Sequence, residues 1–257
     1  MEVVHKMVND LTTLQGSLDE MKDQLISELA NKGVTAEYST STGLLGLIAK
    51  ISEIGEDLES EVIYNDSCTS DRTSNYDTTM HFGSTTNLAT LTFDSSTNGY
   101  IFSGSGGDAF AGKVIPSIRG LDNISIKMDV QLRDTSAYNQ LFIGMADELS
   151  QTSGDMDFFR IRGDGQVDYL HNGGSEIWKQ SNVATFNGNW VTVEFKRQEG
   201  FMTGTVYDDE GEVLVTTTQE LNTYSNPYYF FGVNTRYSSN TKYIRNIIVE
   251  SFDVTVG

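Results

Sequence analysis

The acidic residues are the first side chains to test for catalysis. A glycosidase needs two carboxylates that face one groove, and alternate positions on a strand would supply them. The closest arrangement is Asp155-Met156-Asp157, which follows Ser153-Gly154 and has no third carboxylate beside it. We therefore predict a solvated turn at Asp155 and Asp157 rather than a catalytic pair.

Other catalytic and metal-binding patterns are missing from the sequence. The three histidines, His5, His81 and His171, have no partner histidine at i+4, which disfavours a histidine-based zinc site. No G-x-S-x-G motif occurs. The stretch GSGGDAFAGK at 104–113 has the wrong glycine spacing for a phosphate-binding loop, so we interpret it as an ordinary loop. We predict no catalytic residue, no organic cofactor and no enzymatic activity.

Aromatic side chains beside amides offer a different chemistry, which is sugar binding. The apolar face of a sugar stacks on a ring, while its hydroxyl groups need fixed polar partners. Residues of this kind fall in predicted turns, and our candidate ligand-binding residues are Tyr138, His171, Asn172, Trp178, Tyr224 and Tyr237. An ordinary loop histidine is the alternative for His171. Trp190 begins a predicted strand, and we assign it to the core.

Arg162-Gly163-Asp164 is a tripeptide that cell-adhesion proteins use. Apolar and polar residues alternate at 159–162 and again at 166–169, and Gly-Asp-Gly stands between these runs. This pattern is typical of a β-hairpin. We predict that the tripeptide bends the chain between two strands, with an adhesive role as the less favoured alternative.

The overall charge limits the partners. The chain of 257 residues has 17 basic and 36 acidic side chains, for a formal net charge of −19. Such a charge disfavours nucleic acid and anionic membrane surfaces as partners.

Cys68 is the only cysteine, so no intramolecular disulfide is possible. The start, MEVVHKMVNDL, lacks the pattern of a secretory signal, and no run approaches the roughly 20 apolar residues of a membrane helix. We expect assembly in a cytoplasm without membrane insertion.

Residues 1–60 follow a helical period. Apolar residues at alternating spacings of three and four form a heptad seam, which consists of Val4, Met7, Leu11, Leu14, Leu18, Met21 and Leu25. After a Ser/Thr-rich connector at 34–42, a second helix is predicted from 43 to about 59. So narrow a seam needs partner helices, most simply from copies of the same chain. We predict a coiled coil for self-association; a helical hairpin that folds back onto its own subunit is the alternative.

Residues 61–257 follow a period of two. Alternate apolar residues share one face in two clear runs, which are Ile124, Ile126, Met128, Val130 and Leu132 in the first and Val191, Val193 and Phe195 in the second. Clusters of Gly, Asn and Asp separate such runs. Many short strands with this punctuation indicate a β-sandwich. We predict one sandwich domain over 61–257, preceded by the helical segment 1–60.

Several of these runs resemble the strands of concanavalin A-like (laminin-G-like) jelly rolls. The similar segments are EVIYNDSCTSD at 61–71, FFRIRGDGQVDYLHN at 158–172, NWVTVEFKRQEGFMTGTVYDDEGEVL at 189–214 and YYFFGVNTRYSSNTKYIRNIIVESFDV at 228–254. The resemblance implies a mainly β jelly-roll sandwich, a fold that hosts lectins, hydrolases and structural modules. It also implies a candidate structural calcium where the first loop meets the last strand, at Asp66 and Asp253.

The segment LISELANKGVTAEYSTSTGLLGLIAKISEI at 25–54 is similar to one common in tail and fibre proteins of tailed viruses of bacteria and archaea. The match consists of Lys32, Gly33, Val34, Leu44, Leu47, Ile48, Lys50 and Ile51. This resemblance implies a phage-like fibre or spike, in which the helices form a trimer and bind other virion structural proteins. The β domain would then face outward.

These observations together predict a homotrimeric structural protein of a virion. Its jelly-roll head would attach to a host surface by binding glycans, and three weakly binding copies at fixed spacing would bind far better than one. Two alternatives stay open. One is a carbohydrate-active enzyme or its accessory carbohydrate-binding module, and the other is a capsid decoration or head-fibre protein without a ligand.

Overall fold

The computed structural model describes residues 26–27, 60–82, 88–105, 110–151, 156–171, 175–184, 186–198, 200–220, 224–234 and 242–252. The heptad residues from Val4 to Leu25 lie outside these ranges, as do the residues of the second predicted helix, so the coiled coil stays a prediction. Within the described ranges, no helix has the length and apolar character needed to cross a membrane.

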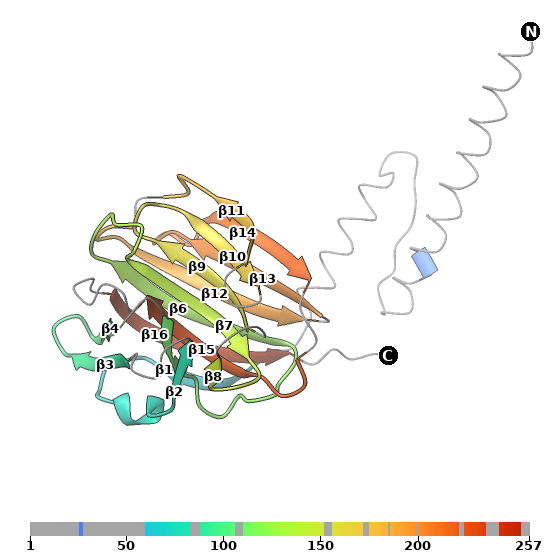
Figure 1. The fold of residues 1–257 in the computed structure, drawn as a ribbon, viewed down its shortest axis with the longest axis horizontal. Helices are drawn as coiled ribbons and strands as arrows, with labels where there is room; N and C mark the ends of the chain where they lie inside the picture. Colours follow the sequence, from blue (N-terminus) through green and yellow to red (C-terminus); the bar gives the residue numbers. More distant parts are fainter. Residues whose placement is uncertain are drawn as a thin grey trace, which may run out of the picture. The chain divides into compact units, whose positions relative to one another are not determined.

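Two sheets stack face to face (Figure 1). The first, which we call the β12 sheet, has the order β14 (Val213–Glu220), β13 (Phe201–Tyr207), β12 (Trp190–Gln198), β6 (Ile124–Leu132), β16 (Lys242–Phe252), β4 (Gly99–Ser105) and β3 (Leu88–Asp94), and β1 (Ser60–Asp66) also pairs with β16. The second, the β9 sheet, has the order β11 (Ser175–Gln180), β10 (Val167–His171), β9 (Met156–Arg162), β7 (Gln140–Ala146), β15 (Tyr228–Asn234), β5 (Phe110–Val114), β2 (Thr79–Phe82) and β8 (Ser150–Gln151). A 3-10 turn, η1 (Thr73–Tyr76), follows β1.

Strands that are neighbours in these two orders run antiparallel, except for the parallel pair β2 and β8. The chain changes sheet several times, for example between β5 and β6 and between β11 and β12. Strands that are distant in sequence therefore become neighbours, and side chains from β6, β12 and β16 meet on one face. The prediction of a mainly β sandwich is confirmed.

The larger of two buried apolar clusters lies between the two sheets and follows the predicted alternation, and a smaller one is formed by β9-sheet residues of the opposite parity, such as Phe142, Phe158 and Phe230. The five apolar residues of β6, from Ile124 to Leu132, are fully buried, and Val191, Val193 and Phe195 of β12 lie beside them. Phe159 of the β9 sheet packs across onto Gly204, where a Cβ atom would clash with its ring. Such close packing between sheets fixes which side of each strand faces outward.

The stretch at 104–113 differs from its predicted loop. Phe110–Val114 forms β5, a strand of the β9 sheet that pairs with β15. Gly112 lies so close to β15 that an added Cβ would be 2.8 Å from the carbonyl oxygen of Phe231. The glycine that suggested a loop therefore permits a close approach between two strands.

Candidate ligand site on the β12 sheet

Trp190 lies on the outer face of the β12 sheet, so its assignment to the core is wrong. Burial alternates along β12, with Val191 directed into the core and Trp190 only partly buried. The parity of the strand explains the difference: Val191, Val193 and Phe195 occupy the inner positions, and Trp190 is one residue out of step with them.

The strand register places the outer side chains in rows. Trp190 is opposite Gln131 of β6, which in turn is opposite Tyr243 of β16. The next row consists of Tyr207, Thr192, Asp129 and Arg245. The row after that consists of Thr205, Glu194, Lys127 and Ile248. Because these residues come from four strands, the register alone creates an outer surface with rings, hydroxyl groups and charges side by side.

A hollow opens beside Trp190. It has a volume of about 570 Å³ and is lined by Ala184, Gly188, Asn189, Trp190, Val191, Asp208, Asp209, Leu214 and Arg245. A second hollow of about 350 Å³ shares five lining residues with the first, which are Trp190, Val191, Asp208, Asp209 and Arg245, and adds Asp129, Thr192, Glu210 and Gly211. The two hollows form one candidate site, which extends from the start of β12 to the β13–β14 turn.

The indole at this site is held in place by an ion pair. The guanidinium carbon of Arg245 lies 4.0 Å from the centroid of the Trp190 ring. Its Nε donates to Oδ2 of Asp129 at 3.2 Å, and Nδ2 of Asn246 donates to the same oxygen at 2.8 Å. The other oxygen, Oδ1, accepts from the hydroxyl of Thr192 at 2.9 Å. Arg245 is thus fixed on one side of the ring by both a cation–π contact and a charged hydrogen bond.

Glu194 organises the neighbouring row. It accepts from the hydroxyl groups of Ser125 and Tyr207, both at 2.6 Å, and its Oε1 lies 3.5 Å from Nζ of Lys127. Burial, together with the bond to Glu194, raises the pKa of Tyr207 to about 12. The phenol is therefore protonated at neutral pH and acts as the donor in this bond.

Asp129 and Glu194 occupy diagonal positions on neighbouring strands, with their Cα atoms about 8 Å apart. A pair of carboxylates on one face is an arrangement that glycosidases use. Here every carboxylate oxygen of the two residues accepts a hydrogen bond from another side chain of the chain. The pair thus holds Thr192, Tyr207 and Arg245 in position, which suits binding better than proton transfer.

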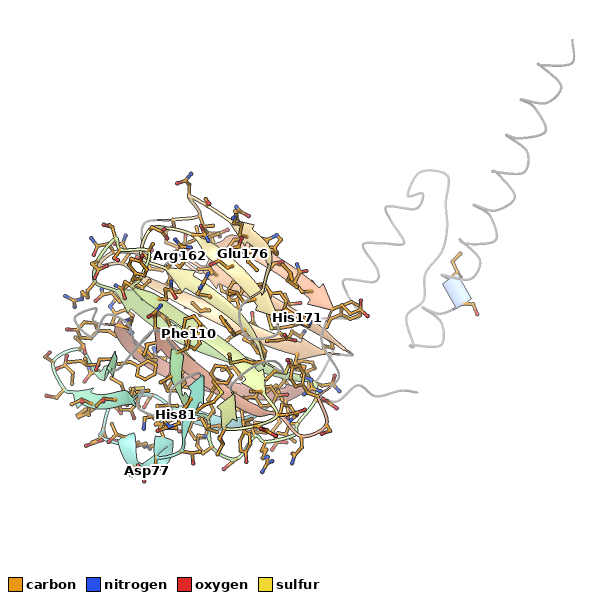
Figure 2. The ribbon with its side chains drawn as sticks, viewed as in Figure 1. Asp77, His81, Phe110, Arg162, His171 and Glu176 are labelled. Carbon is orange, nitrogen blue, oxygen red and sulfur yellow. The ribbon has the colours of Figure 1, made fainter. Side chains whose placement is uncertain are left out.

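The sequence-predicted ligand residues do not gather at one place. Tyr138 is exposed in the loop between β6 and β7, whereas Tyr224 is buried with 6 % of its surface exposed. Trp178 of β11 is opposite Tyr169 and packs partly against the core. His171 ends β10, and Figure 2 shows it well away from Arg162 at the other end of the hairpin. Asn172 and Tyr237 lie outside the described residues, and ligand contact by any of the six stays a prediction.

We expected Asp157 to lie in a solvated turn. It is instead fully buried near the start of β9. Its Oδ1 lies 2.7 Å from Nδ1 of His171, the last residue of β10. Burial, with the nearby Asp157, raises the pKa of Tyr169. The aspartate is thus part of a polar cluster at one end of the sandwich; Asp155 lies outside the described residues.

The hairpin prediction for Arg162-Gly163-Asp164 is confirmed. β9 and β10 pair antiparallel, and the backbone N–H of Arg162 donates to the carbonyl of Gln166 at 2.9 Å. The guanidinium of Arg162 and the carboxylate of Asp164 bind each other, at 2.6 Å and 3.1 Å. The two charged side chains that an adhesive loop would present are therefore paired within the turn.

Asp66 has a hydrogen-bonding role that does not favour calcium. Its Oδ2 accepts from the phenols of Tyr76 at 3.0 Å and Tyr100 at 2.7 Å, and its Oδ1 accepts from the backbone N–H of Cys68 at 2.9 Å. These donors take the oxygen atoms that a calcium ion would need. The described residues contain no group of three or more acidic, histidine or cysteine side chains suited to a metal. Asp253 lies outside them, so a calcium ion stays a prediction from resemblance.

Comparisons with known proteins identify a fold. No family model and no curated protein sequence matches the chain. Among solved structures, peanut lectin with a nine-residue peptide is similar with a TM-score of 0.55 at 10 % identity, over 77 % of this chain and 100 % of the lectin. The lectin UEA-II complexed with galactose has a TM-score of 0.53 at 10 % identity, over 76 % and 99 %. Arcelin-5, a lectin-like defense protein from Phaseolus vulgaris, has a TM-score of 0.52 at 11 % identity, over 76 % and 99 %. At these identities the likeness shows a lectin-like sandwich fold.

The site on the β12 sheet differs from the sequence prediction, which places the ligand-binding residues in turns. A signal was present in the strands themselves. The polar positions of KMDVQL and WVTVEFKR contain Asp129 and Gln131 in the first and Trp190, Thr192 and Glu194 in the second. An aromatic ring among polar residues on the outer side of a strand is unusual for a face that only meets water.

Proposed function

We propose that the β-sandwich binds a glycan in the hollow beside Trp190. The observation that carries this proposal is a partly exposed indole, fixed by Arg245 and bordered by the carboxylates of Asp129 and Asp208. Sugars bind where a ring contacts their apolar face and fixed polar atoms contact their hydroxyl groups. Both components are present here, and the Asp129 network holds them in place before a ligand arrives.

The lectin-like fold supports the same proposal. The lectin UEA-II, which shares this sandwich, was solved in complex with galactose. Fold alone does not fix function, because one fold carries many different sites. The proposal therefore depends on the side chains of the β12 sheet.

The test is glycan binding by a Trp190→Ala variant. A glycan array first identifies bound sugars, and isothermal titration with the best of them then compares the variant with the wild type. We expect the affinity to fall roughly tenfold or more, since the loss of a stacking ring costs on the order of 1.4 kcal/mol or more.

Phe201→Ala is the matched control, because Phe201 is an exposed ring at the end of β13 opposite to Tyr207 and lines neither hollow. It should bind as the wild type does, and both variants should stay folded at the temperature of the assay, with a single cooperative unfolding transition above it. Equal affinity of Trp190→Ala and the wild type would place the glycan site elsewhere. Release of shortened sugars from a bound polysaccharide would instead support a carbohydrate-active enzyme.

A second proposal concerns where the site is presented. We propose that the chain is a fibre or spike protein of a virus particle, in which residues 1–60 join three copies and attach them to other virion proteins. Its support is the heptad pattern from Val4 to Leu25 and the K-G-V segment at 32–34, both from the sequence. Three glycan sites on one assembly would bind a host surface by avidity.

A further inference from the structure

We infer that the site on the β12 sheet binds a linear, uncharged chain of several sugar units that crosses the strands, rather than one terminal sugar. This inference rests on the proposed glycan-binding function. It starts from three partly buried aromatic side chains on the same outer face, Tyr207 of β13, Trp190 of β12 and Tyr243 of β16.

The register sets the spacing of these three residues. Trp190 and Tyr243 are both opposite Gln131, so they lie two strands apart, or about 10 Å at the usual strand separation. Tyr207 is opposite Thr192, one strand and two residues from Trp190, which corresponds to about 8 Å. A hexose unit lengthens a linear chain by roughly one strand separation of about 5 Å. Trp190 and Tyr243 can therefore contact alternate units of one chain, and Tyr207 would contact a unit one or two positions further along.

Each ring is held in a fixed position. Arg245 lies over Trp190, and the guanidinium carbon of Arg133 lies 4.4 Å from the centroid of the Tyr243 ring. The hydroxyl of Tyr207 donates to Glu194 at 2.6 Å. Rings that are already ordered lose little conformational entropy when a ligand binds, which favours their use as stacking platforms.

Gln131 supplies an independent indication of a ligand between two of the rings. Its Nε2 donates to the carbonyl of Gly188 at 2.6 Å, so the amide is held in place, and the side chain is 6 % exposed. Its Oε1 is buried and has no hydrogen-bond partner among the described residues. An unsatisfied buried acceptor costs about 1–3 kcal/mol, which a sugar hydroxyl would recover. Since Oε1 is itself covered, this contact requires a small movement of the side chains around it.

The charges around the hollow exclude acidic chains. Asp208, Asp209 and Glu210 border it, and within the described part of the chain none of the three pairs with Lys or Arg. Arg245, the cation of the lining, is paired with Asp129. A uronic-acid or sialylated chain would meet net negative charge here, in a protein whose formal charge is −19. Uncharged sugars meet no such penalty.

The experiment measures affinity against chain length for the full-length protein. The probes are ladders of one to six units of β-1,4-linked glucose, mannose and N-acetylglucosamine, with an oligogalacturonate ladder as the acidic comparison. We expect the affinity for at least one neutral ladder to rise about tenfold or more between one and four units. The acidic ladder should bind more weakly than that neutral ladder at every length. Tyr243→Ala should lower affinity for the six-unit chain about fivefold and leave that for the two-unit chain within about twofold.

Tyr243→Phe keeps the ring and should behave as the wild type, and Phe201→Ala is again the control for an exposed ring outside the site. Suppose that Trp190→Ala abolishes binding, but that affinity changes neither with chain length nor with Tyr243→Ala. This result would overturn the inference and leave the proposed site intact. Tighter binding of the oligogalacturonates would also overturn it. Binding that is insensitive to Trp190→Ala, or no binding of any ladder, would overturn the proposed site together with the inference.

Discussion

At the scale of single residues, burial determines which chemically active groups can react. Cys68 is fully buried beside Asp66, and its Sγ lies 3.4 Å from the backbone carbonyl oxygen of that residue. Burial is the main cause that raises the pKa of the Cys68 thiol to about 12, and the nearby charge of Asp66 adds to it. Because the thiolate is the reactive form, the native thiol should be inert near neutral pH.

A thiol titration tests this at pH 8. We expect the native protein to react with a disulfide reagent such as DTNB at least about a hundredfold more slowly than the urea-unfolded protein, since both the thiolate fraction and access are lost on folding. The unfolded chain is its own control and should release one equivalent, because Cys68 is the only cysteine. A native reaction as fast as that of a free thiol would contradict the buried position.

At the scale of elements, the β9–β10 hairpin shows how backbone geometry restricts a short motif. Gly165 has a φ of +84°, and an added Cβ would lie 2.7 Å from the carbonyl oxygen of Ala184. A Cβ at Gly163 would clash with the carbonyl oxygen of Asp134. Asp164, between them, forms an ion pair with Arg162 at the surface, where such a pair contributes little, and its Oδ1 also accepts from the backbone N–H of Gln166 at 3.4 Å.

These positions give opposite predictions for alanine substitution. Gly163→Ala and Gly165→Ala should each lower the free energy of unfolding by about 1–3 kcal/mol, through overpacking and a strained φ. Asp164→Ala should change it by less than about 1 kcal/mol. Urea unfolding followed by tryptophan fluorescence measures all three. If Asp164→Ala lowers the free energy of unfolding as much as the glycine variants do, the Asp164 side chain stabilises the fold and the tripeptide does not act only as a bend between two strands.

The elements also show which features the sequence predicts and which need the structure. The inner positions of β6 and β12 could be predicted because burial imposes a period of two along each strand. A large aromatic residue at a strand start is typical of a core position, whereas Trp190 alternates with the buried Val191 and therefore faces outward. The row of Trp190, Gln131 and Tyr243 joins strands far apart in the chain. No local pattern encodes that pairing, because it follows from how the sheets assemble.

At the scale of the whole molecule, the charge and the proposed assembly act in the same direction. A formal charge of −19 on each chain keeps copies soluble but makes them repel one another. Association therefore needs a strong and specific contact, and the heptad seam from Val4 to Leu25 is the part of the sequence with that pattern. The repulsion also predicts that added salt favours association, because salt screens charges more than about 10 Å apart.

Light scattering on the full-length protein tests the trimer. We expect a mass of three times 28.4 kDa for the wild type. A variant with Leu11→Asp and Leu18→Asp should have the mass of one chain, because charges in the middle of the seam would be buried without partners. Asn9→Asp with Asp19→Asn is the control, since it changes polar flanking positions and keeps the net charge.

A monomeric wild type at physiological salt would remove the basis for avidity. The glycan affinity of one sandwich would then be the whole affinity of the protein, and a virion spike would need some other means of bringing copies together.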